Sequence, residues 1–224
     1  MTESASTRPP ADDCWWLTPA ERRVIEPDLA ALSTWHAAPA QAIAARSACS
    51  IAVTGTNPLV EPVLHALQST HLQISTMKSA EVVIVTVDAC LDTWTLPADI
   101  QDRVHLPVHA HPGSSRVGPV VVPGRTACLR CWSLHRQDAI SEDVIDLDRD
   151  LRVDPLVAMV TAAATASLLR HWIDAPEDSP GRVLEFCVPD LTPRTHHISP
   201  HPACGCLWQA PANWGATGEG HRPQ

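Results

Sequence analysis

Four cysteines in two tight pairs, far apart along the chain, constrain this sequence more than any other feature. Cys128 and Cys131 form a Cys-x-x-Cys pair in "GPVVVPGRTACLRCWSLHR", and Cys204 and Cys206 form a Cys-Gly-Cys pair in "SPHPACGC". Each pair can present two thiolates to one tetrahedral ion, and Gly205 relieves the crowding between its neighbours. Two such pairs make a closed four-sulfur site, which is structural because no coordination position stays open. The spacing predicts a structural zinc site.

Other interpretations of the cysteines remain open at this point. A lone Cys-x-x-Cys also serves thioredoxin-like redox chemistry, where it begins a helix after an early strand and needs no second pair. The thiols could also be unpaired core residues. His135 and His201 are near enough in sequence to act as substitute ligands, although four thiols make them unnecessary. The other four cysteines each stand alone in the sequence. We expect three of them to be buried and inert, namely Cys49, Cys90 and Cys187.

The length and composition indicate one globular domain with short extensions. The chain has 224 residues, of which 45% are hydrophobic and 18% charged, enough for a sizeable core. Its net charge of −9 opposes binding to nucleic acid or to an anionic membrane, because both require patches of Lys and Arg. No apolar run approaches the roughly 20 residues that span a bilayer, and the N-terminus lacks the pattern of a secretory signal. We therefore expect a cytoplasmic protein.

Strand-like and helical patterns alternate along the chain, which predicts an α/β sheet flanked by helices. Expected helices cover 39–48, 57–69 and 154–173, the last beginning with an Asp cap and a Pro in its first turn. Its Ala-rich surface suits a homodimer interface and intrachain packing equally well. An acidic connector is expected at 137–153. Strands are expected at 50–55, 72–76, 81–88, 104–111, 116–124, 181–188 and 194–199.

The later half of the chain resembles a known superfamily. The segments "GPVVVPGRTACLRCWSLHR", "DPLVAMVTAAATASLL" and "HPACGC" are similar to the ThiF/MoeB-type adenylyltransferases. They resemble most the ThiF-like cyclodehydratase-associated proteins of thiazole/oxazole-modified peptide (bacteriocin) biosynthesis. The resemblance implies a Rossmann-type ThiF-like domain over 49–208. It also implies that the four paired cysteines are zinc ligands that staple the crossover loop to the C-terminal end of the sheet.

The nucleotide site of that superfamily is degenerate in this sequence. Its active members cradle ATP with a glycine-rich loop after the first strand, but "VTGTNPLVEP" retains only Gly55 and places Pro58 and Pro62 where backbone donors are needed. Asp88 matches one acidic position, and Lys78 is the only lysine of the chain. We therefore expect little or no binding of ATP.

The sequence favours a non-catalytic scaffold that docks a YcaO-type cyclodehydratase or a precursor peptide. The alternative is a divergent adenylyltransferase that activates a peptide or carrier-protein carboxylate. Residues 1–48 are expected to form a disordered start and a helical extension in place of the leader-peptide-binding module of the relatives, and 209–224 a flexible tail. Trp15, Trp16 and Trp35 in the extension are candidates either for contact with a partner or for packing onto the domain.

Overall fold

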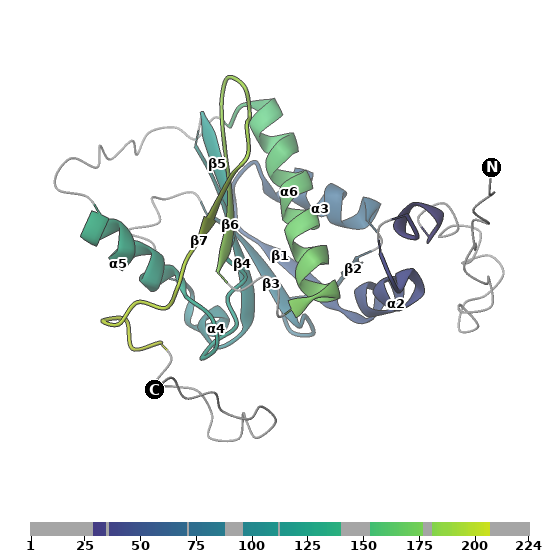
Figure 1. Ribbon diagram of the computed structural model, residues 1–224, viewed down its shortest axis with the longest axis horizontal. Coiled ribbons are helices and arrows are strands. Elements are labelled where there is room, and N and C mark those ends of the chain that lie inside the picture. The colour runs from purple at the N-terminus through teal and green to yellow at the C-terminus, as the bar shows by residue number, and fades with distance from the viewer. Residues whose placement is uncertain are drawn as a thin grey trace, which may run out of the picture.

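A seven-stranded mixed sheet in the order β2-β1-β3-β4-β5-β6-β7 forms the centre of the computed structural model (Figure 1). The structure describes residues 29–34, 36–70, 72–87, 96–111, 113–139, 153–176 and 181–206. The strands are β1 Ser50–Thr54, β2 Gln73–Ile74, β3 Val82–Val87, β4 Val104–His111, β5 Ser114–Val117, β6 Arg182–Cys187 and β7 Arg194–His197. The helices are α2 Pro39–Ala48, α3 Val60–Ser69, α4 Ala98–Gln101, α5 Leu129–Ala139 and α6 Pro155–Asp174.

The sheet has a parallel half and an antiparallel half. Strands β2, β1, β3 and β4 pair in parallel, whereas β4 to β7 pair antiparallel. The parallel half comes from strand–helix–strand units with crossover connections. Every residue of β3 is buried, which confirms that its continuous apolar run is a parallel strand covered on both faces.

Helices lie on both faces of the sheet. On one face α6 and α3 form the main core with the side chains of Ile84, Leu106 and Val108, and α6 crosses this face in Figure 1. On the other face Val83 and Val85 pack against the short α4. The N-terminal half of α5 contributes to a smaller cluster on β6. The α/β class predicted from the sequence is therefore confirmed.

Helix α6 is the core helix of the described structure. Asp154 caps it by accepting from the backbone N–H groups of Leu156 and Val157, as the sequence predicted. Among the described helices, α6 alone is long and apolar enough to cross a membrane, although no uninterrupted apolar run was evident in the sequence. Its buried positions pack within the chain against α3 and the sheet, whereas Leu156 and Met159 are exposed.

Three sequence predictions need correction. The strand expected at 116–124 ends at Val117, because Gly118 takes a φ of +104° and Pro119 has no N–H for a ladder. The strand expected at 72–76 has only two residues. The acidic connector expected at 137–153 starts later than predicted, because α5 continues through 137–139.

Candidate metal centre

The four paired cysteines meet at one point of the fold. The Sγ atom of Cys128 lies 3.8 Å from that of Cys131 and 3.5 Å from that of Cys204. The Sγ atoms of Cys131 and Cys206 are 3.4 Å apart, and all four lie within 4.8 Å of one another. Zinc–sulfur bonds of about 2.3 Å at tetrahedral angles place sulfurs roughly 3.8 Å apart. The cluster therefore has the dimensions of a tetrahedral thiolate site for one metal ion.

Two chain segments bring these thiols together. Cys128 precedes the first residue of α5, and Cys131 lies in the first turn of that helix, so the i, i+3 spacing sets both sulfurs on one side. Cys204 and Cys206 follow β7, the last strand of the sheet, with Gly205 between them at a φ of +73°. Nothing lies near a Cβ built on Gly205, so this glycine serves the turn rather than close packing. The cluster joins the start of α5 to the segment after β7.

Without a cation, two of the clustered thiols resist ionisation. Burial, together with the neighbouring cysteines, raises the pKa of Cys204 to about 11, and the same causes raise the pKa of Cys206 further. Four thiolates so close together repel one another, and burial penalises each charge. A bound divalent cation removes this penalty, since a coordinating thiol is deprotonated. The donor set thus fits a thiophilic metal such as zinc.

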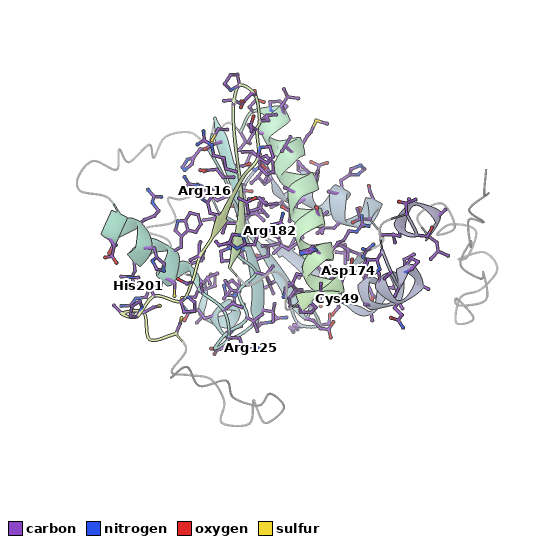
Figure 2. All side chains as sticks on the ribbon, in the orientation of Figure 1. Cys49, Arg116, Arg125, Asp174, Arg182 and His201 are labelled. Atoms are coloured by element: carbon purple, nitrogen blue, oxygen red, sulfur yellow. The ribbon has the colours of Figure 1, made fainter. Side chains whose placement is uncertain are left out.

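The two histidines weighed as substitute ligands hold the adjoining segments instead. His201 donates from Nε2 to Asp138 at 2.8 Å and accepts the N–H of Ala203 at Nδ1, which uses both ring nitrogens. His135 donates from Nε2 to the carbonyl of Ser199 at 2.9 Å. The two rings stack edge to face, 4.8 Å apart. They bridge α5 and the segment around the Cys-Gly-Cys pair; His201 is labelled in Figure 2.

Gly55, the one candidate nucleotide residue within the described ranges, lies away from this cluster. Gly55 follows β1 at the edge where the parallel strands end, at a φ of +139°. A Cβ there would come within 2.7 Å of the Thr86 carbonyl oxygen on β3, so the close approach of β3 restricts this position to glycine. Asp88 lies outside the described residues, as do Cys90, Trp15, Trp16 and Trp35. Cys49 and Cys187 are half-buried rather than fully buried.

Two polar features of the sheet were not predicted from the sequence. Glu185 on β6 is bonded to Arg116 and to His196, and the Arg116 guanidinium lies 5.7 Å from the Trp132 ring centroid. His105 is buried at the start of β4. The signal for His105 was available, because "VHLPVHAH" puts histidines at alternate positions of a strand, on the face opposite the apolar residues.

The fold defines a class that includes enzymes of known structure. The heterocyclase TruD has a TM-score of 0.57 at 18% identity over 78% of this chain. The chain spans only 29% of TruD. E. coli MccB with MccA-N7isoASN has a TM-score of 0.60 at 11% identity, over 87% of this chain and 76% of MccB. A complex of E. coli MccB with AMPCPP and MccA gives a TM-score of 0.59 at 12% identity, over 88% of this chain and 76% of MccB.

At these identities the likeness establishes the fold alone. No protein-family model matches the sequence, and no curated protein matches it. One MccB structure is described as a Microcin C7 biosynthetic enzyme in complex with N-formylated MccA, and another structure of the same fold as a heterocyclase with substrate and cofactor.

Proposed function

We propose that this chain is a zinc-stabilised, non-catalytic scaffold with a ThiF-like fold that acts in the biosynthesis of thiazole/oxazole-type modified peptides. The fold shared with the heterocyclase TruD and with MccB supports the pathway. The scaffold docks a YcaO-type cyclodehydratase or a precursor peptide. Cys128, Cys131, Cys204 and Cys206 hold the zinc, which fixes α5 to the end of β7.

The N-terminus of α3 supports the proposal that the chain does not use ATP. A phosphate-binding helix start needs backbone N–H groups that point at the ligand. Here Pro58 and Pro62 have no N–H, and the Asn57 side chain already accepts the N–H of Leu59 at 3.0 Å. The N–H of Val60 donates to the Asn57 carbonyl. The helix start is therefore largely satisfied by the chain itself, which leaves little for a triphosphate.

The divergent adenylyltransferase remains the second candidate, and one observation favours it. Gly55 keeps a positive φ directly after β1, at the edge where nucleotides bind in open parallel sheets. A peptide or carrier-protein carboxylate is the substrate in that case. The two candidates differ in whether ATP is bound and whether pyrophosphate exchanges.

Calorimetry with ATP and Mg²⁺, and pyrophosphate exchange with candidate peptides, test the proposal. We expect no micromolar binding of ATP and no exchange above background, together with binding of a YcaO-type enzyme or precursor peptide encoded beside this chain. Exchange that disappears in Asp88→Ala overturns the scaffold in favour of the enzyme. Absence of both ATP binding and partner binding rejects both candidates.

A further inference from the structure

A cavity of about 460 Å³ lies between α3, α6 and the start of β6. Its wall includes Ser69 and Thr70 at the end of α3, several residues from the C-terminal half of α6, and Arg182, the first residue of β6. Because α3 leads from the end of β1 to the start of β2, the cavity sits at the edge where the parallel strands begin. Gly55 follows the opposite end of β1. The cavity is thus separate from the expected nucleotide edge, and none of the four clustered cysteines is among its described lining residues.

The charged side chains give this cavity a positive character. Its described lining contains three arginines, Arg46, Arg170 and Arg182, but a single carboxylate, Asp174, in a chain of net charge −9. Asp174 and Arg182 are labelled in Figure 2. The carboxylate already accepts from Arg46, whose Nε donates to Oδ1 at 2.9 Å and whose Nη2 donates to Oδ2. Both oxygens of Asp174 are therefore engaged by Arg46.

Arg182 is a cation without a counter-ion in the described part of the chain. Its guanidinium forms no hydrogen bond or ion pair there, and its Nε atom is buried. The terminal Nη1 and Nη2 atoms also lack a partner but stay accessible, so they can reach a ligand where Nε cannot. An arginine keeps its charge in proteins, and a half-buried charge of this kind is costly unless it is paired. The unpaired guanidinium in the wall of a cavity indicates that an anion binds there.

The rest of the wall favours a single negative charge on an apolar body. The hydroxyls of Ser69 and Thr70 already donate to carbonyls of α3, so they are not donors for an anion. The wall also contains the C-terminal ends of α3 and α6, whose dipoles oppose further negative charge. Ala66, Leu168 and Leu184 add apolar surface. Two parallel N–H groups of a guanidinium match the two oxygens of one carboxylate, and an apolar wall suits an apolar ligand body.

We propose that this cavity binds a small monocarboxylate with a compact apolar body, held by the Nη1 and Nη2 groups of Arg182. The carboxylate supplies the counter-ion that Arg182 lacks, and its apolar body packs against the alanine and leucine side chains of the wall. A dianionic phosphate ester fits less well, because its second charge has no further unpaired cation to meet and faces the two helix C-termini.

Benzoate and benzamide form a matched pair for the test, because they have nearly the same shape and differ in charge. Titrations of the zinc-loaded full chain with each, in a buffer free of phosphate and of other carboxylates, are followed by the backbone amide resonances of residues 182–184. We expect benzoate to bind about tenfold or more tightly than benzamide, and phenyl phosphate to bind more weakly than benzoate. Equal affinity for benzoate and benzamide, no saturable binding of either, or a preference for phenyl phosphate overturns the proposal.

Variants then locate the anion. Arg182→Met removes the guanidinium but keeps an unbranched side chain, and it should lower the affinity for benzoate to that for benzamide. Arg182→Lys retains the charge without the two parallel donors and should recover only part of the loss. Arg194→Met is the control for the loss of a positive charge, because Arg194 is exposed on β7, and it should retain the preference for benzoate. Benzoate binding that is unchanged in Arg182→Met overturns the proposal. If Arg182→Met does not fold, the wild-type ligand pair still decides.

Discussion

Glu185 illustrates how the fold sets the chemistry of single residues. Its carboxylate accepts from Arg116 Nε at 2.7 Å and pairs with His196 Nε2 at 3.0 Å. Burial raises the pKa of Glu185, but the hydrogen bonds and charges of Arg116 and His196 outweigh it and hold the pKa below the ordinary value of 4.5. The carboxylate joins β5, β6 and β7 through these contacts.

A lowered pKa in the folded state makes this network a source of acid sensitivity. Its stabilisation is fully present above pH 4.5 and is lost as the pH falls through the lower folded pKa. We expect Glu185→Gln to cost about 1–3 kcal/mol at pH 7 and to flatten the dependence of unfolding free energy on pH below about 5. Denaturant unfolding at several pH values measures both. An unchanged slope in the variant would show that Glu185 does not contribute to the acid response.

Substitution of a cysteine in the cluster should affect zinc content and stability, whereas substitution of a cysteine outside the cluster should not affect zinc content. Cys131→Ser removes the most buried of the four proposed ligands, and we expect less than one zinc per chain and a lower Tm. Structural zinc sites contribute about 10–16 kcal/mol in model peptides, so the loss should be large. Cys187→Ser, on β6 outside the cluster, is the matched control and should keep one zinc. Metal analysis that finds one tightly held zinc in Cys131→Ser contradicts the ligand assignment.

Local sequence patterns predicted individual helices and buried strands better than they predicted how the strands pair. The Asp-Pro start of α6 and the continuous apolar run of β3 were sufficient to place both elements. Helix α5 was not predicted from the sequence, because its few apolar residues pack into a small cluster. Its first turn also contains Cys131, a member of the cysteine cluster. The antiparallel half was also not foreseen, since strand direction depends on long-range pairing. Cysteine spacing predicted the cluster because tetrahedral geometry restricts it.

Helix α2 is attached to α6 by an ion pair that no local sequence pattern predicts. The side chain of Arg46 is 4% exposed and that of Asp174 is 8% exposed, and Arg46 Nε donates to Asp174 Oδ1 at 2.9 Å. Asp174 ends α6, next to α2 (Figure 2). His36 Nε2 lies 3.8 Å from the same carboxylate. The pair fixes the helical extension to the sheet domain.

Breaking one side of this pair should cost more than replacing both. Arg46→Met leaves a buried carboxylate without its guanidinium, which costs about 3–5 kcal/mol. We expect the double variant with Arg46→Met and Asp174→Leu to recover most of that loss, because apolar residues of similar size replace a buried pair with little net change. Urea unfolding of the two single variants and the double variant gives the coupling energy. Strictly additive losses would mean that the two side chains do not interact.

The whole molecule combines two halves that are stabilised differently. The parallel half rests on a large apolar core shared by α3, α6 and the central strands. The antiparallel end shares this core through Val117 and Phe186, but its outer part has only a small cluster that includes Trp132 and the strand β7, whose four residues are all exposed. In the proposed zinc-bound form, the metal compensates for this thin core, because it joins α5 to the chain after β7 without requiring buried apolar area.

Removal of the metal should therefore loosen one half of the molecule before the other. We expect a chelator to lower the hydrogen-exchange protection of backbone amides in α5, β7 and the 198–206 segment, while amides of β1 and β3 stay protected, because their burial on the sheet does not involve the cluster. Exchange followed by mass spectrometry with and without chelator measures this, and added zinc should restore the protection. Cys187→Ser should respond as the wild type does. Uniform loss of protection across both halves would instead indicate a single cooperative unit, and no change anywhere would mean that the cluster holds no structural metal.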